Sequence, residues 1–323
     1  MVKSKGEPET EEGDSSTLSS DEVLELLADE TRISILKTLW DLKEPYPQGS
    51  EPVSFSRLID AVGHQDPGTF NYHLGKLVGV YVEKNEDGYE LSPMGNHVIH
   101  NLIAGTISDY KSVDQTPVDR SCHVCGSNDV IMEYETGRLY VKCTSCEGGY
   151  PDSDFPSGML EAVGLPPAGL EGRTPNEIHE VDHKWAYFRW SSRFAGVCPV
   201  CSGQDTGTVM VCENHDSGER ACDNCGSSHK IRVLRTCTVC KSWTLMPSWV
   251  APIYGSLKVA SFYDDHGIDV RSRSANTLGH TIEEESVVSE APLEVLVMIN
   301  IDGDRLEVLL DDEGDVIKVR ENV

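Results

Sequence analysis

Pairs of cysteines spaced C-x-x-C are the residues of this 323-residue chain best suited to chemistry. Two such pairs can supply four thiolates to one tetrahedral zinc ion. The first two pairs are Cys122/Cys125 and Cys143/Cys146, with 17 residues between them. The intervening segment, DVIMEYETGRLYVKC, alternates in the manner of a β-hairpin. This spacing predicts a zinc ribbon.

A second group of candidate ligands lies downstream. Its members are Cys198, Cys201, Cys212, His215, Cys222, Cys225, Cys237 and Cys240. Eight ligands predict two more zinc ions, which makes about three per chain. Pairing successive motifs along the chain is the simplest arrangement. A nested arrangement, which joins 198/201 with 237/240, and a cross-brace of alternate pairs stay open. With four protein ligands each, the sites are expected to support folding rather than catalysis.

The segment HEVDH, residues 179–183, matches the H-E-x-x-H signature of zinc metalloproteases. A capping box, TPNE, predicts that it lies on a helix over residues 174–196. The apolar stripe expected for this helix is Ile178, Val181, Trp185 and Phe188. His179 and His183 then point away from that stripe, and no third ligand follows them. We therefore expect a pair of histidines on the surface of the helix, which could pack the connector against a zinc module. A zinc hydrolase using Glu180 is the weakest of three hypotheses.

Other enzyme signatures, such as a P-loop, G-x-S-x-G or a dinucleotide fingerprint, do not occur, so no enzyme is expected. The chain has 54 Asp and Glu against 27 Lys and Arg, a net charge of −27. Such a charge repels itself in dilute buffer but is screened in molar salt, which is typical of proteins from salt-loving archaea. No apolar run reaches the roughly 20 residues of a membrane helix, and no signal peptide is visible. These features predict a cytoplasmic protein with reduced cysteines.

The elements expected around these sites define an α+β, multidomain chain. The predicted order is a disordered tail (1–18), a winged helix-turn-helix (19–106), a zinc ribbon (119–150), a helical connector (151–196), two zinc modules (197–245) and a C-terminal αβ domain (246–323). Residues 106–120 are expected to be a linker. The last domain is predicted to contain a helix followed by an antiparallel β-meander.

The order of four helices, a hairpin and a further helix over residues 21–105 is that of a winged helix. In the fourth helix, Phe70, Leu74 and Leu77 share one face and should be buried. The outward residues and the hairpin are then the candidate DNA contacts. They are Thr69, Asn71, Tyr72, His73, Lys76, Lys84 and Asn85. Asn can pair with adenine, and Lys can reach guanine or phosphate.

The segments LADETRISILKTL, GTFNYHLGKL and YELSPMG resemble the ArsR-like winged helix-turn-helix of archaeal and bacterial regulators. The whole layout is similar to regulators of halophilic archaea that carry zinc-ribbon modules. The resemblance implies a transcriptional regulator that binds double-stranded DNA as a homodimer. Some members sense metals through cysteines near the DNA, but this chain has no Cys before Cys122. Metal sensing of that kind is therefore not expected.

Two features leave other partners open. Residues 20–105 contain 14 acidic and 6 basic residues, which repels DNA in ordinary buffer, so the winged helix could serve protein contact instead. Residues 184–241 are by contrast basic, with eight Lys and Arg against five acidic residues. They either balance the zinc thiolates or contact nucleic acid or RNA polymerase through Lys230, Arg232 and Arg235. The alternative function is a basal factor similar to archaeal transcription factor E, or another RNA-polymerase-associated zinc-ribbon protein.

Overall fold

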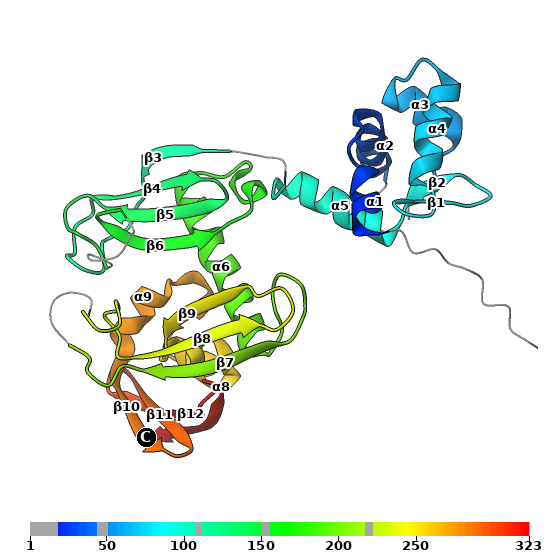
Figure 1. The fold of residues 1–323 in the computed structure, drawn as a ribbon. Coiled ribbons are helices and arrows are strands. Elements are labelled where there is room, and N and C mark those ends of the chain that lie inside the picture. Colours follow the sequence, from blue (N-terminus) through cyan, green and yellow to red (C-terminus); the bar gives the residue numbers. More distant parts are fainter. Residues whose placement is uncertain (1–18, 44–50, 108–110, 150–155, 217–221, 323) are drawn as a thin grey trace, which may run out of the picture. The chain divides into compact units, whose positions relative to one another are not determined.

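The computed structural model describes residues 19–43, 51–107, 111–149, 156–216 and 222–322. Its helices and antiparallel sheets confirm the α+β class (Figure 1). The chain separates into two compact units, Met1–Ile107 and Ser108–Val323. Among the helices of the described ranges, none combines the length and the apolar character needed to span a membrane.

The first unit consists of five helices and one hairpin within its described part. They are α1 (Ser20–Glu25), α2 (Glu30–Asp41), α3 (Phe55–Val62), α4 (Pro67–Leu77), β1 (Val82–Lys84), β2 (Tyr89–Leu91) and α5 (Pro93–Ala104). β1 and β2 pair antiparallel and form the predicted hairpin between α4 and α5. The side chains of Ser19, Ser54 and Ser92 cap their helices by accepting a backbone amide of the first turn.

The core of this unit contains Phe70, Leu74 and Leu77 of α4, all buried as predicted. In α5, Met94 is 47% exposed and Ile99 is buried. The reason is a close approach at Gly95. A Cβ on Gly95 would lie 2.1 Å from the carbonyl oxygen of Tyr81, so the helix turns its glycine side, which also carries Ile99, to the core.

The second unit begins with a four-stranded antiparallel sheet. Its strands, in spatial order, are β3 (Val113–Pro117), β4 (Val130–Glu135), β5 (Arg138–Cys143) and β6 (Met159–Gly164). The β4–β5 hairpin is predicted by the sequence, whereas β3 lies in the expected linker and β6 in the expected helical connector. Gly158, which directly precedes β6, allows the chain to pass close to β5. Its φ is +84°, and a Cβ there would lie 2.1 Å from the carbonyl oxygen of Cys143, so only glycine lets β6 begin beside β5.

One long helix, α6 (Pro175–Phe194), follows the short 3-10 turn η1 (Pro167–Leu170). Its first turn has the predicted capping box, in which Thr174 and Glu177 bond to each other's backbone amides. A three-stranded antiparallel sheet follows, made of β7 (Asp205–Val211), β8 (Ile231–Cys237) and β9 (Trp243–Pro247).

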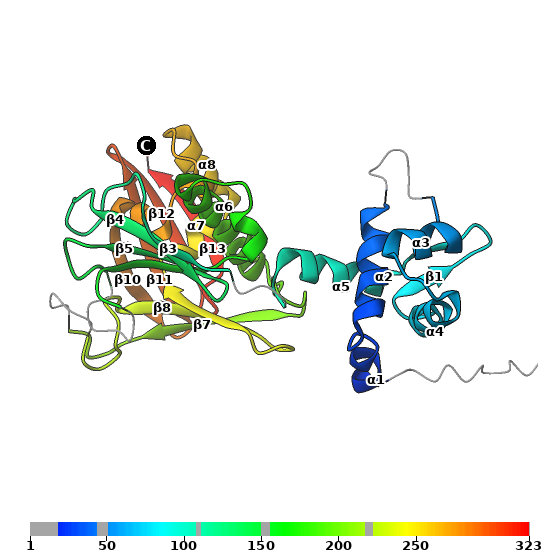
Figure 2. The same ribbon diagram turned by 90° about the horizontal axis from the view of Figure 1, so that it is seen from above.

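The C-terminal part contains helices and the predicted β-meander. Its elements are α7 (Val250–Gly255), α8 (Leu257–Asp265), η2 (Val270–Ser272), α9 (Ala275–Leu278), η3 (Gly279–Thr281), β10 (Ile282–Glu290), β11 (Leu293–Ile301), β12 (Asp304–Leu310) and β13 (Val316–Asn322). Helix α7 packs against α6, as Figure 2 shows. A single hydrophobic core joins Val209 and Val233 of the β7–β9 sheet to Val297 and Val308 of the meander. This core crosses the domain boundary predicted at 245/246.

Candidate metal centres

The first cysteine cluster lies at one end of the β4–β5 hairpin. The Cys122/Cys125 turn precedes β4 and the Cys143/Cys146 turn follows β5, and the pairing of Val130 with Cys143 brings the two turns together. The Sγ atoms of Cys122 and Cys146 are 3.7 Å apart, as are those of Cys125 and Cys143. A tetrahedral ion with metal–sulfur bonds of about 2.3 Å separates its ligands by about 3.8 Å. These four side chains could therefore hold one metal ion.

Backbone amides point at the sulfur atoms of this cluster. The amides of Val124 and Gly148 donate to Cys122 and Cys146, each at 3.4 Å. Burial opposes ionisation of Cys122, but the amides of Cys125 and Val124 outweigh it and lower the pKa of this thiol to about 7. Burial raises the pKa of the Cys146 thiol to about 12. Four thiolates this close repel one another, and a bound cation would remove that repulsion.

The downstream ligands form two clusters in the nested arrangement. Cys198 and Cys201 join Cys237 and Cys240, with Sγ distances of 3.7 Å (198 to 240) and 3.5 Å (201 to 237). The second cluster consists of Cys212, His215, Cys222 and Cys225. Pairing successive motifs is therefore wrong. The reason is that β7 and β8 are antiparallel and Asp205 pairs with Cys237, so the turns that flank one end of this hairpin lie 36 to 42 residues apart in sequence.

In the cluster that contains His215, the imidazole Nδ1 lies 3.6 Å from the sulfur of Cys225. The amide of Asp216 donates to Cys222 at 3.3 Å and lowers the pKa of this thiol to about 6. The guanidinium of Arg232 donates to the carbonyl oxygen of Cys225 at 3.4 Å. The basic side chain of Arg232 thus stabilises the backbone of a ligand residue in this cluster.

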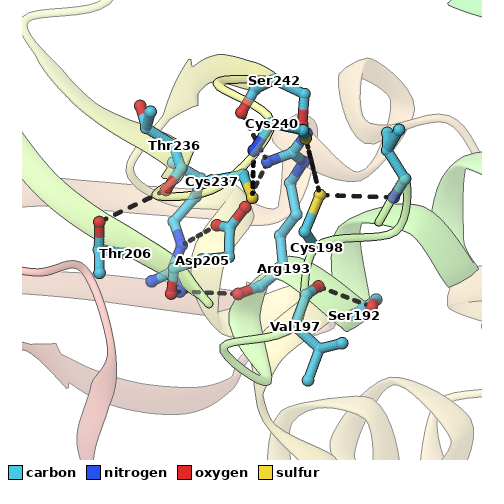
Figure 3. A network of polar contacts seen from close by, with 12 residues as sticks. Ser192, Arg193, Val197, Cys198, Asp205, Thr206, Thr236, Cys237, Cys240 and Ser242 are labelled. Atoms are coloured by element: carbon cyan, nitrogen blue, oxygen red, sulfur yellow. Dashed lines mark hydrogen bonds and ion pairs between the residues drawn. The ribbon is translucent and has the colours of Figure 1, made fainter. Parts of the chain in front are cut away.

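A buried polar network adjoins the cluster of Cys198 and Cys240 (Figure 3). Arg193 makes an ion pair with Asp205, and its guanidinium donates to Ser242 Oγ at 3.0 Å. That hydroxyl oxygen in turn lies 3.4 Å from the sulfur of Cys198. Arg235 is 1% exposed and pairs with Asp205 and Asp315. The hypothesis that Arg235 contacts nucleic acid or polymerase is therefore wrong, because its charge is used inside the protein.

The predicted DNA contacts fall into two groups in the first unit. Thr69, Asn71, Tyr72 and Lys76 are exposed on α4, and Lys84 and Asn85 are exposed on the hairpin. His73 is half-buried, and its Nδ1 lies 3.3 Å from a carboxylate oxygen of Asp29. Asn85 Oδ1 accepts the amides of Asp87 and Gly88, so this side chain shapes the turn. The freest donors on α4 are consequently those of Asn71 and Lys76.

The predicted orientation of α6 is partly wrong. The buried residues of α6 are Ile178, Asp182, Ala186 and Arg193. Trp185 and Phe188 are 40% and 64% exposed, so half of the predicted apolar stripe faces outward. The side chains of His179 and His183 are only 12% and 10% exposed, which fits the alternative that this pair packs against another element. They lie against Glu161 of β6, and these three side chains are a further group that could hold a metal ion.

Sequence reasoning missed Glu161 because β6 is missing from the predicted elements. The available signal is a single carboxylate inside the otherwise apolar segment MLEAVG. Glu161 is buried, and its pKa is held well below the usual value, because its contacts with His179 and His183 and the charge of Arg120 outweigh its burial. Burial raises the pKa of the neighbouring Asp182 well above its usual value.

Two family models match the chain. One, described as domain of unknown function DUF7347, matches residues 20–102. The other, described as domain of unknown function DUF7351, matches residues 119–316 and covers more than half of the chain. No curated protein matches the chain. No solved structure matches it either. The chain therefore belongs to the family described as domain of unknown function DUF7351.

Proposed function

We propose that this protein is a DNA-binding transcriptional regulator. In this proposal the first unit is a winged helix-turn-helix of the ArsR-like type, and the second unit is held together by three zinc ions. The observation that carries the proposal is the division of α4 into two faces. Phe70, Leu74 and Leu77 are buried, while Asn71, Tyr72 and Lys76 are exposed on the other side of the same helix.

The exposed face of α4 has the chemistry needed to read base edges. An Asn side chain can bond adenine with two hydrogen bonds, and a Lys can bond guanine or a phosphate. Tyr72 is 61% exposed, and the ammonium of Lys76 lies 5.7 Å from its ring centroid. The aromatic ring therefore supports the lysine on the helix surface. His73 is the weakest of the predicted contacts because Asp29 already neighbours its ring.

The three cysteine clusters fit zinc in a structural role. Eleven thiolates with one imidazole are soft ligands, and four-coordinate sites without an open position are typical of structural zinc. The clusters lie at the ends of the β4–β5 and β7–β8 hairpins, where a metal ion would fix the hairpin ends. In this proposal the metals hold the second unit together and take no part in chemistry.

The decisive experiment is immunoprecipitation of crosslinked chromatin in the native salt, with the wild type and the Asn71→Ala/Lys76→Ala variant. A small set of sharp sites that share a motif, lost in the variant, is the expected result. The matched control is Lys37→Ala, because Lys37 is an exposed lysine on α2 and should leave occupancy unchanged. Enrichment at nearly all active promoters would favour the basal-factor function instead. Equal binding of wild type and variant would refute the role of α4.

A further inference from the structure

We propose that Glu161, His179 and His183 form a fourth metal site, which binds a divalent ion such as Zn²⁺ with one coordination position left for water or an anionic ligand. The site combines a carboxylate from β6 with two imidazoles one turn apart on α6. It has three nitrogen and oxygen ligands, whereas each cysteine cluster has four ligands that are mostly sulfur. It goes beyond the proposed function, since DNA binding and structural zinc do not require it.

The distances among the three side chains suit a small cation. Nε2 of His179 and Nε2 of His183 each lie 3.3 Å from the same carboxylate oxygen, Oε2 of Glu161. A tetrahedral ion with bonds of about 2.0–2.1 Å separates its ligand atoms by about 3.3–3.4 Å. Two imidazoles and one carboxylate are also a donor set that zinc prefers when a site keeps one position open.

A contact on the far side of His183 orients the ring for metal binding. Nδ1 of His183 lies 3.3 Å from the carbonyl oxygen of Ser272 in η2. Because a carbonyl only accepts, Nδ1–H is the donor of this bond, and Nε2 is the nitrogen that would bind an ion beside Glu161. A metal-binding histidine usually donates its other N–H to a backbone carbonyl in this way.

Arg120 shows which nitrogen of the His179 ring has a free lone pair. Its Nη1 lies 2.7 Å from Nε2 of His179 and 2.8 Å from Oε1 of Glu161. A guanidinium only donates, so Nε2 of His179 must be the acceptor and carries no hydrogen. In a metal-bound site, Nε2 of both imidazoles and Oε2 of Glu161 would all be ligands of the same ion.

Arg120 is also the main competitor of a metal ion. It supplies a positive charge beside Glu161, with a side chain that is 13% exposed. Metal binding would leave its bond to Oε1 intact and release its contact with His179, because the ion uses Oε2. The alternative to a metal site is thus a hydrogen-bonded cluster centred on Arg120, and the experiment below separates the two.

A cavity of about 280 Å³ borders the site. Glu161 and His183 are in its wall, and the remaining lining is largely apolar, with Met159, Trp190 and Tyr254, and with Arg273 as a cationic group. Three protein ligands leave a fourth position for water or an exogenous donor. A cavity beside that position gives an anionic small molecule access to the ion, with Arg273 as a second contact for its charge.

The site is not a metalloprotease centre, although HEVDH prompted the comparison. In such enzymes the Glu of H-E-x-x-H is the general base beside the metal. Here Glu180 is exposed, whereas the side chains of His179 and His183 are only 12% and 10% exposed and lie against Glu161. The third ligand precedes the motif by 18 residues. The arrangement therefore supports reversible metal and ligand binding in which Glu180 is not the general base.

The test is cobalt binding by the full chain after its cysteine sites are filled with zinc. One further equivalent of Co²⁺ should bind and give visible d–d absorption without a thiolate charge-transfer band, since the ligands are nitrogen and oxygen. Elemental analysis after zinc saturation should find about four metals in the wild type and about three in Glu161→Gln and His183→Ala. Glu180→Gln, which alters the exposed Glu of the same motif, should keep about four.

Two results would overturn the proposal. One is a zinc-filled wild type that binds no cobalt, which would identify the cluster as a hydrogen-bonded centre around Arg120. The other is a cobalt spectrum that Glu161→Gln and His183→Ala leave unchanged. The wild-type titration needs no variant, so misfolding of a variant cannot hide the answer. None of these readouts depends on DNA binding, so the proposed function can fail without affecting this result.

Discussion

Asp205 and Arg235 form a hydrogen-bonded ion pair inside the second unit, with Nε and Oδ1 3.2 Å apart. Their side chains are 0% and 2% exposed. Asp205 also pairs with Arg193 at the end of α6, so one carboxylate serves two buried guanidinium groups. Arg235 further donates to the carbonyl oxygen of Arg193 at 2.7 Å. The network connects α6 to the β7–β8 hairpin beside the cluster of Cys198.

Replacing Asp205 by Asn should destabilise the second unit strongly. The substitution keeps the shape but removes the charge that two buried arginines share, and breaking such a pair costs about 3 kcal/mol or more. Asp315→Asn is the matched control, because it removes the charge of the other partner of Arg235. The side chain of Asp315 is 45% exposed, so this substitution should lower the free energy of unfolding by less than about 1 kcal/mol. The free energy of unfolding from denaturant titrations measures both. Equal losses in the two variants would contradict the assigned role of Asp205.

The ligands of the cysteine clusters could be predicted from the sequence because each C-x-x-C turn is a local structure. The same holds for the capping box at Thr174. The pairing of the turns could not be predicted, because it depends on the antiparallel register of β7 with β8. The Arg235 pair is equally non-local, since Asp205 precedes it by 30 residues and Asp315 follows it by 80.

The candidate site of Glu161 shows where pattern reasoning fails on α6. An amphipathic helix was expected to bury its large apolar residues, yet Phe188 is exposed and Asp182 is buried. The periodicity identifies a helix correctly, but the choice of buried face depends on what packs there. In this protein Glu161 of β6 and the carbonyl oxygen of Ser272 in η2 lie against α6. These polar groups favour burial of a histidine side chain over an apolar one at that face of the helix.

Removing the metals should unfold the second unit and spare the first. The three cysteine clusters lie entirely within residues 122–240, whereas the first unit has its own apolar core around Leu36 and Phe70. Short modules with closed metal sites lose most of their stability without the ion. Calorimetry of the full chain with a strong chelator should therefore lose one transition and keep the other. Survival of both transitions after confirmed removal of zinc would show that the clusters are not needed for folding.

The stability of the C-terminal part should fall as His266 loses its proton. Hydrogen bonding to the carbonyl oxygen of Phe262 and the carboxylate of Asp304, together with the charge of Asp302, raises the pKa of His266. A raised pKa in the folded state means that the contribution is complete below the ordinary value of about 6.5 and is lost as the pH rises through the folded value. NMR titration of the imidazole measures the shift directly. Asp304→Asn should bring the pKa back toward its ordinary value, and an unchanged pKa would exclude this pair as a cause.

If the first unit binds DNA, its affinity should depend weakly on salt. Residues 20–105 contain 14 acidic and 6 basic residues, so few phosphates can be neutralised and few counterions released. A protein with 6–10 phosphate contacts loses about 10³–10⁵ in affinity between 50 and 200 mM salt, and a much smaller loss is expected here. Lys76→Ala should weaken binding to the selected DNA while Lys37→Ala, an exposed lysine of α2, leaves it unchanged. Fluorescence anisotropy over a potassium chloride series gives both the affinity and the slope. A steep slope would mean that basic residues outside this unit supply the phosphate contacts.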